Sequence, residues 1–375
     1  MPYDVPHAVS PSLWVLAWKR LLADRVAMVS LAIVAAFLLM MLLSGTGLIA
    51  KDWSREVGVN YAPPSFAGAD AESAAPSAAP TAGAASSDAS DEIPVVDPLA
   101  DALAAIRGEA PKATSTEPSA AEGQSVDPLA DVMADIKAKG TKADAVEARR
   151  STLPFGGDKW GRDVLKKTIK GSETSIFVGL AAAVVATFLG TVFGAMSGYY
   201  GRWLDDIFNW FYSVFTSIPY LLLILAVAAV LQQKGTLTII LILGLTGWTG
   251  VFRLIRGEYL KHKGREYVQA ADAIGASNVR RMFVHIFPNI SHVVLVQLSI
   301  LTVAFIKSEV ILSFLGFGVP VDVVSWGSML NEAQNELILG KWWQLAAAGT
   351  AMALLVTAFS LFTDALRDAL DPKLK

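Results

Sequence analysis

Six runs of mostly apolar residues along this chain are long enough to cross a bilayer as helices, and polar segments separate them. A transmembrane helix needs about 20 such residues to cross roughly 30 Å of hydrocarbon. We therefore predict an all-α integral membrane protein with six transmembrane helices. The predicted spans lie near residues 26–50, 174–199, 208–232, 236–256, 291–317 and 344–363.

The segment before the first span is amphipathic. Trp14, Trp18 and Leu21 share one helical face and Arg20 lies beside it, a pattern typical of a helix at the membrane surface. A cleaved signal peptide is the alternative to a first span. The apolar run is long for a signal peptide and more spans follow it, so we favour an uncleaved helix within an N-terminal region 1–59.

Residues 60–150 differ from the rest of the chain. They are rich in Ala, Pro, Ser, Asp and Glu, and the string VDPLAD at 96–101 recurs at 126–131. Such a composition has too little apolar bulk to form a core. We expect a disordered, extracytoplasmic, low-complexity insertion ahead of a five-helix core, 151–375. It is either a tolerated insertion with nascent helices or a docking segment for an extracytoplasmic partner.

Two spans contain residues that favour close packing or bending. Gly190, Gly194 and Gly198 form a repeated G-x-x-x-G ridge on the second span, where a neighbouring helix backbone can approach closely. Pro219 in the third span removes a backbone hydrogen bond and predicts a kink.

The composition excludes several kinds of chemistry. Only 17% of residues are charged, against about 25% in a soluble domain, and the net charge of −3 gives no reason to expect nucleic acid. The chain has 0 cysteines and 4 scattered histidines, so we expect no metal site and no thiol chemistry. It contains no phosphate-binding G-x-x-x-x-G-K-S/T string. We therefore expect no catalytic residue and no cofactor bound by this chain.

The polar loop 257–290 lies between two predicted spans and has a helix–turn–helix pattern. The first helix is expected to end at Gly275, since glycine adopts a positive φ without strain. Ser277 and Asn278 can cap a second helix, and Pro288 is expected to mark its limit.

One face of this loop has the character of a docking surface. Tyr267, Ala270, Ala271 and Ile274 recur at helical spacing. The rim of this face is basic and consists of Arg265, Arg280 and Arg281. An ordinary amphipathic surface helix is the alternative interpretation.

The loop resembles the "EAA" loop of ABC-importer membrane subunits through Gln269, Ala270, Ala271, Gly275 and Pro288. In that family the loop is the coupling helix, which sits in a groove of the ATPase subunit. Gln269 stands where the family usually has Glu, which puts a salt bridge to the ATPase in doubt, and His285 stands at the usual Ile.

Further stretches resemble dipeptide and oligopeptide permease subunits. They are 158–165, 309–318, 325–330 and 364–372. The resemblance covers roughly 1–60 and 151–375 and omits the insertion. It implies a type I ABC importer-like fold, and it implies that a binding protein docks at Ser325, Trp326 and Gly327.

The resemblance also implies partners. These are a second, homologous permease subunit, two ATP-binding subunits that hold ATP and Mg, and an extracytoplasmic solute-binding protein. The cargo would be peptides, with nickel chelates or another small solute as the alternative. ATPase motion transmitted through the coupling loop would drive alternating access.

The distribution of Lys and Arg near span ends predicts the orientation. It places both termini and the loop 257–290 in the cytoplasm, although the basic patch 159–170 disagrees. The expected location is the bacterial inner membrane, as a multi-pass protein.

Two charges lie inside the fifth predicted span. Glu309 either lines the translocation path or is a buried structural carboxylate. Lys307 lies about 200° away around the helix, so the two do not pair along one face. An ion-coupled secondary transporter is a rival function, but only Glu309 could serve as an ion-binding carboxylate there. An integral membrane enzyme would need a cluster of catalytic residues that the sequence does not contain.

Overall fold

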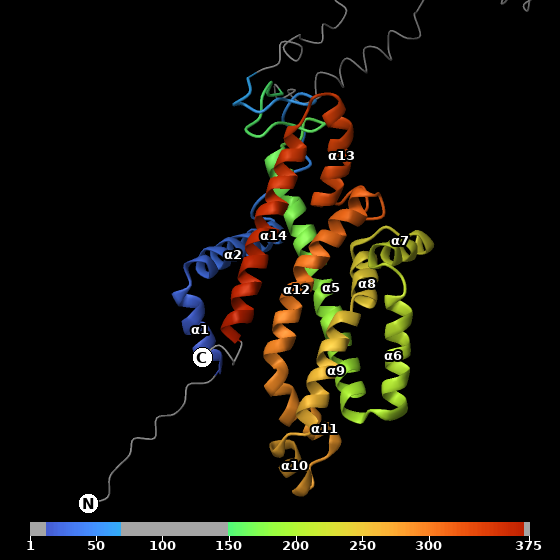
Figure 1. Ribbon diagram of the computed structural model, residues 1–375. Coiled ribbons are helices and arrows are strands. Elements are labelled where there is room, and N and C mark those ends of the chain that lie inside the picture. The colour runs from blue at the N-terminus through green and yellow to red at the C-terminus, as the bar shows by residue number, and fades with distance from the viewer. Residues whose placement is uncertain (1–12, 69–148, 371–375) are drawn as a thin grey trace, which may run out of the picture. The chain divides into compact units, whose positions relative to one another are not determined.

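A computed structural model of the chain describes residues 13–68 and 149–370, and the regular elements in these ranges are all helices (Figure 1). In chain order they are α1 (Leu13–Ala23), α2 (Arg25–Gly45), α5 (Val164–Tyr200), α6 (Arg202–Thr216), α7 (Tyr220–Leu231), α8 (Thr236–Thr246), α9 (Thr249–Lys263), α10 (Glu266–Ala273), α11 (Asn278–Arg280), the π-helical turn η1 (Arg281–Ile286), α12 (Phe287–Phe314), α13 (Trp326–Ile338) and α14 (Trp343–Leu370).

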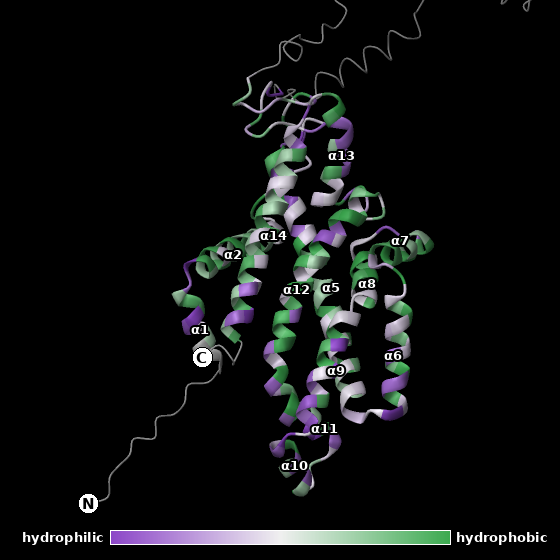
Figure 2. Ribbon diagram, in the orientation of Figure 1, coloured by the Kyte–Doolittle hydropathy of each residue, from purple (hydrophilic) through white to green (hydrophobic). Residues whose placement is uncertain are grey.

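The all-helical membrane fold is confirmed. Four helices in the described ranges are each long and apolar enough to span a bilayer: α2, α5, the continuous helix 278–314, and α14. Two bent pairs, α6 with α7 and α8 with α9, raise the number to six if each pair is one span. Figure 2 shows that α2, α7 and α8 are mostly hydrophobic, whereas hydrophilic residues are frequent in α13 and in the loop that holds α10 and α11.

The third predicted span is broken rather than kinked. The axes of α6 and α7 differ by 86° across Ser217, Ile218 and Pro219. Proline disfavours the helical conformation in the residue before it and cannot donate a backbone hydrogen bond. The helix therefore stops at Thr216, and a new helix, α7, begins after Pro219 in a different direction.

The N-terminal helix α1 packs on the C-terminal end of α14. Ala17 and Leu21 are buried in a cluster with Leu366, Ala369 and Leu370. Trp18 is 54% exposed, so Trp18 and Leu21 do not share one environment as the amphipathic pattern predicted. Contact with α14 buries only the side of α1 that carries Ala17 and Leu21, which is a smaller part of the helix than the amphipathic pattern suggested.

The glycine ridge of α5 lies against α9. A Cβ atom added at Gly190 would stand 2.6 Å from the Cβ of Val251, and one at Gly198 would stand 2.6 Å from the carbonyl oxygen of Arg256. At Gly194 the nearest atom would be the carbonyl oxygen of Phe252, at 2.8 Å. These distances are shorter than van der Waals contact, so any side chain there would push the two helices apart.

A cap closes the N-terminal ends of α5 and α14. As labels only, we call this end of the helices the outer end, and the end with the loop 257–290 the inner end. It is built from residues 46–68 and 149–163, which pair through short bridges such as Gly58 with Arg150. The amide of Ser65 donates to the carbonyl of Leu153 at 2.8 Å, and Arg149 pairs with Glu56 at 2.5 Å. Residues 61–68 thus belong to the cap, not to an insertion beginning at residue 60.

The segment 69–148 leaves the cap and returns to it at neighbouring positions. Ser65 and Leu153, on either side of it, are joined by a backbone hydrogen bond. The repeated VDPLAD strings lie outside the described residues, and the disorder predicted for them stays a prediction.

Because both ends of segment 69–148 are held together by the cap, we expect its removal to be tolerated. A variant in which a short Gly-Ser linker replaces 69–148 is expected to insert into the membrane and to keep the transport activity that the resemblance implies at close to the wild-type rate. Cell-surface labelling and uptake in whole cells measure the two properties separately. Normal insertion with lost uptake would instead favour the segment as a docking site for a partner.

Candidate functional site

The loop between α9 and α12 protrudes at the opposite end of these helices from the cap (Figure 1). α10 ends before Gly275, which has a φ of +81°, and the side chain of Ser277 accepts a hydrogen bond from the amide of Arg280 at 3.3 Å. This is the helix, turn and second helix expected from the local sequence.

Pro288 does not end the second helix, contrary to the prediction. The helix runs from Asn278 to Phe314 through η1, and Pro288 occupies the first turn of α12. In a π-helical turn the hydrogen bonds skip one more residue than in an α-helix. This change of pattern restarts the helix at Phe287, and a proline is tolerated in a first turn because its missing N–H is not needed there.

Several contacts hold the loop against the inner end of α5. Lys263 Nζ donates to the carbonyl of Tyr199 at 2.7 Å, and the hydroxyl of Tyr199 donates to Asn278 Oδ1 at 3.2 Å. Arg281 lies over the Tyr199 ring and forms an ion pair with Asp272. Arg281 therefore stabilises the loop through contacts within this chain and is not an unpaired charge on the rim of the docking face.

The predicted docking face is divided between the inside and the outside of the loop. Ala271 is only 4% exposed and packs inward with Val268, so it is not available to a partner. Ile274 is 84% exposed at the end of α10, and Ala270 is exposed beside it. Helical spacing alone predicted that Ala271 lies on the docking face with Ala270 and Ile274. In the structure, η1 packs against the side of α10 that carries Ala271.

The remaining predicted loop residues take different roles. The side chain of Gln269 donates to the carbonyl of Gly264 at 3.3 Å, and Tyr267 is hydrogen-bonded to His262 at 2.8 Å. Arg265 and Arg280 are exposed. The exposed apolar side chains at the end of α10 are thus Ala270 and Ile274, which we call the tip, and Val279, Phe283 and Val284 are exposed further along the loop.

At the outer end, Ser325, Trp326 and Gly327 are all buried. Ser325 and Ser328 cap α13 reciprocally, and the indole N–H of Trp326 donates to the carbonyl of Thr168 at 3.1 Å. A Cβ at Gly327 would lie 2.5 Å from the carbonyl oxygen of Val310. A partner cannot touch these residues in this conformation, so the prediction of docking directly on them is corrected: they set the position of α13.

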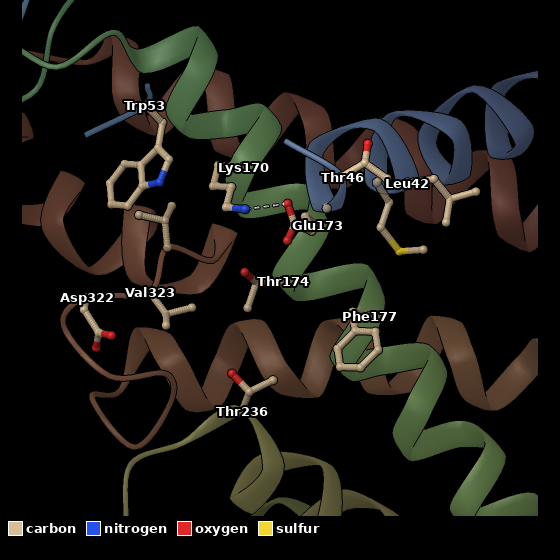
Figure 3. Close-up of a pocket in the computed structure, with 13 residues that line it drawn as sticks. Leu42, Thr46, Trp53, Lys170, Glu173, Thr174, Phe177, Thr236, Asp322 and Val323 are labelled. Carbon is tan, nitrogen blue, oxygen red and sulfur yellow. Dashed lines mark hydrogen bonds and ion pairs between the residues drawn. The ribbon is translucent and has the colours of Figure 1, made fainter. Parts of the chain in front are cut away.

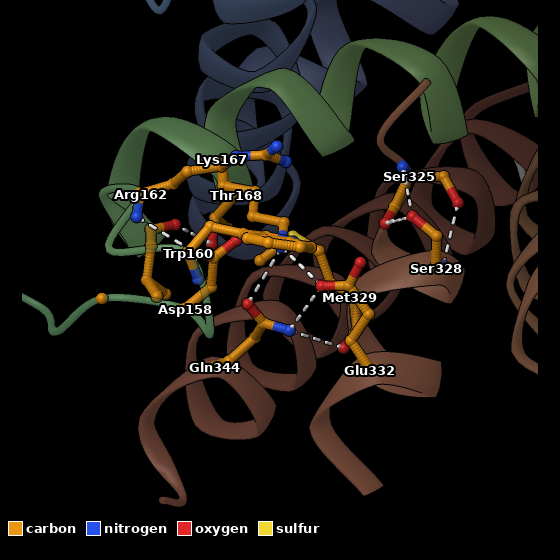
Figure 4. A network of polar contacts seen from close by, with 12 residues as sticks. Asp158, Trp160, Arg162, Lys167, Thr168, Ser325, Ser328, Met329, Glu332 and Gln344 are labelled. Carbon is orange, nitrogen blue, oxygen red and sulfur yellow. Dashed lines mark hydrogen bonds and ion pairs between the residues drawn. The ribbon is translucent and has the colours of Figure 1, made fainter. Parts of the chain in front are cut away.

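A buried charge cluster ties the cap to α5 (Figure 4). The ammonium of Lys167, only 2% exposed, contacts Asp158 at 2.7 Å, Glu332 at 2.6 Å and Gln344 at 3.2 Å. In the sequence, Lys167 stood out only as part of the basic patch 159–170. Asp158 was the one hint in the sequence that a lysine of this patch could be buried, since a buried lysine needs an acidic partner.

A cleft of about 540 Å³ lies where the outer ends of α2 and α5 meet the segment 322–324 (Figure 3). Lys170 pairs with Glu173 at 2.8 Å on its wall, and Ser44 of α2 donates to Glu173 at 2.5 Å. The bond from Ser44 joins the first span to α5, whereas the Lys170–Glu173 pair lies within α5. In the two described ranges, no group of three or more His, Asp or Glu side chains is placed to hold a metal ion.

Glu309 is fully buried, and its carboxylate accepts a hydrogen bond from Ser313 at 2.7 Å. It does not line an open path in this conformation, because packing covers that side of α12. Lys307 on the same helix is exposed.

The buried carboxyl of Glu336 on α13 predicts that the stability of the folded protein depends on pH. Burial raises the pKa of its carboxyl from 4.5 to about 7, with smaller effects of Lys167, Glu332 and Asp158, and neither oxygen has a hydrogen-bond partner among the described residues. The folded state thus holds a proton that the unfolded state releases above pH 4.5, so stability falls as pH rises toward 7. The loss is up to about 1.4 kcal/mol per pH unit.

We expect the melting temperature of the purified protein to fall between about pH 5 and 7 and to level off above, since this range lies between the ordinary pKa of 4.5 and the raised pKa of about 7. Glu336→Gln removes the titrating group and is expected to flatten this profile and to raise the melting temperature at about pH 8, where the wild-type carboxyl is charged. Gln334→Glu, which adds a carboxylate at an exposed position of the same helix, is the matched control and keeps the wild-type profile. An unchanged profile in Glu336→Gln would contradict the assignment.

Comparison with known proteins agrees with this architecture. Residues 190–375 match the model of the binding-protein-dependent transport system inner membrane component, and residues 12–64 match the N-terminal transmembrane domain of oligopeptide transport permease C. A dipeptide transport system permease protein of Bacillus subtilis is 38% identical over 221 residues, which cover 59% of this chain and 69% of that protein.

Other relatives are similar to comparable extents. An oligopeptide transport system permease protein of Bacillus subtilis is 38% identical over 59% of this chain and 72% of its own length. One of Haemophilus influenzae is 34% identical over 58% of this chain and 70% of its own length. With matches at both ends of the described residues and across the protruding loop, the chain belongs to the family of inner membrane components of binding-protein-dependent transport systems, the permease subunits of ABC importers.

Proposed function

We propose that this permease subunit imports dipeptides or oligopeptides, and that an ATPase subunit moves it through the loop 257–290. The observation that carries the coupling role is the form of the loop: an exposed apolar tip on a base anchored to α5 and α12. The peptide cargo is supported by the names of the relatives, which are dipeptide and oligopeptide permeases.

The contacts of the loop provide a route for force. Its tip, Ala270 and Ile274, is accessible, whereas Val268 and Ala271 are buried. A push on the tip passes through Asp272 and Arg281 to Tyr199 on α5, and directly along the continuous helix 278–314. The two long helices at the centre of the molecule would then move with the ATPase.

The complete importer contains more than this chain. We infer a second, homologous permease subunit, two ATP-binding subunits that hold ATP and Mg, and an extracytoplasmic solute-binding protein. The loop and both chain termini would face the cytoplasm, and the cap would face outward. ATP hydrolysis would take place in the partner subunits.

The binding protein would meet the exposed outer end of α13 in place of the buried turn 325–327. Three consecutive apolar residues are exposed there: Leu337 (48%), Ile338 (84%) and Leu339 (58%). Exposed apolar side chains of this kind favour contact with another protein.

The coupling role is tested by a charge at the tip. In the purified, reconstituted complex, Ile274→Glu is expected to lower uptake at least roughly tenfold, the change that about 1.4 kcal/mol of interaction represents, while the complex still assembles. Ile274→Val, which keeps the tip apolar, is the matched control. Gly275→Glu is a poorer test, because the φ of +81° strains any side chain.

Uptake and ATP turnover are measured together in this experiment. Normal uptake by Ile274→Glu would overturn the docking of the loop on an ATPase. Failure of the complex to assemble in both variants would show that the tip holds the subunits together without transmitting motion.

The cargo is tested with the solute-binding protein. We expect mass spectrometry of the ligand that co-purifies with it to find peptides of two or more residues. A bound nickel chelate or another small solute in their place would overturn the peptide assignment and leave the permease role intact.

A further inference from the structure

One strip of α12 is left uncovered by the rest of the chain. Phe305 and Leu312 pack with α5 and α8, while Ile306 and Val310 face α13 and α14. The remaining strip carries three exposed residues at helical spacing: Ile300, Lys307 and Ile311. It is apolar apart from one ammonium group.

Lys307 lies well inside the membrane-spanning part of the helix. Glu173 of α5 is bonded to Ser44 near the end of α2, which marks the outer end of the first span. Gly179, further along α5, packs directly against Ile306, since a Cβ added there would overlap Ile306 Cγ1. At about 1.5 Å per residue, the level of Ile306 and Lys307 is about 9 Å below that outer end.

A lysine at this depth is costly if it faces lipid. Intramembrane lysines almost always face a water-filled cavity or pair with an acidic group. Among the described residues, no ion pair joins the ammonium of Lys307 to a carboxylate. Glu309, two residues away, is bonded to Ser313 on the covered side of the helix.

We propose that Lys307 lines the aqueous translocation path and pairs with the carboxylate of a peptide in transit. This assignment rests on the peptide cargo proposed above. Every unmodified linear peptide carries a terminal carboxylate, whatever its side chains. A single cation on a strip bordered by Ile300 and Ile311 would attract that group by its charge and would make no demand on the peptide sequence.

Whether Lys307 faces an aqueous path is tested by the accessibility of a cysteine introduced at this position. The chain is suited to this experiment because it contains 0 cysteines. Lys307→Cys is assembled into the full complex in proteoliposomes and treated with a membrane-impermeant, sulfonate-bearing thiosulfonate reagent. The wild-type complex corrects for thiols of the partner subunits. Val184→Cys, on an exposed apolar strip of α5, is the matched control that is expected to face lipid and to stay unmodified.

We expect the thiol introduced by Lys307→Cys to be modified, and the modification to become faster or slower when ATP is added, as a path that alternates between its two openings requires. No modification in any nucleotide state would overturn the proposal, because the side chain would then face lipid or a dry interface with another subunit.

The role of the Lys307 charge is tested by measuring the uptake of a dipeptide whose side chains carry no charge. Lys307→Met and Lys307→Cys are expected to lower uptake several-fold, and Lys307→Arg to keep it. An aminoethyl thiosulfonate reagent, which restores a cation on the thiol of Lys307→Cys, is expected to recover uptake, whereas the sulfonate-bearing reagent is not. A C-terminally amidated peptide that the binding protein delivers should be insensitive to Lys307→Met.

Three results would overturn the role of the charge. They are unchanged uptake in Lys307→Met, equal loss for free and amidated peptides, and loss of complex assembly, which would indicate a pair with an acidic residue of a partner subunit. Stimulation of ATP turnover by the loaded binding protein is measured in parallel. If the wild type imports no peptide although ATP turnover is stimulated, the cargo proposal fails, and the accessibility of the thiol in Lys307→Cys still tests the path.

Discussion

The close approach of α5 and α9 is the constraint on which the rest of this structure depends. At three glycines α5 presents no side chain to α9, so the backbone and the Cβ atoms of α9 lie directly on the backbone of α5. In lipid, where burial of apolar surface gives little driving force between helices, such packing supplies most of the attraction. α5 then carries the other elements: Lys167 joins it to the cap, Gly179 to α12, and Tyr199 to the protruding loop.

The two ends of α5 differ in how they are held. At the outer end, Lys167, Asp158 and Glu332 form a network of buried or partly buried charges, which tolerates little displacement because a separated buried charge is costly. At the inner end the loop rests on an aromatic ring and a few polar bonds while its tip stays exposed. The broken helix at Pro219 and the π-helical turn η1 interrupt the regular hydrogen-bond pattern, and such interruptions are where helices change direction.

Two charges on α12 have opposite surroundings although they are only two residues apart. Glu309 is enclosed by packing and bonded to Ser313, whereas Lys307 faces the uncovered strip. About 200° of helical rotation separates them. The carboxylate therefore belongs to the joint between α12 and its neighbours, and the lysine belongs to whatever occupies the open side.

The local sequence determined the elements of this protein. Apolar length located the spans, Gly275 and Ser277 located the turn in the loop, and the glycine spacing located a helix contact, since each depends on neighbours within a few residues. Only the tertiary structure decided which surfaces are free. Ala271, the turn 325–327, and Glu309 are covered by segments distant in sequence, and residues 61–68 join the cap through bonds to residues beyond 148. A periodic pattern places residues on a common face of a helix, but what covers that face is set by long-range packing.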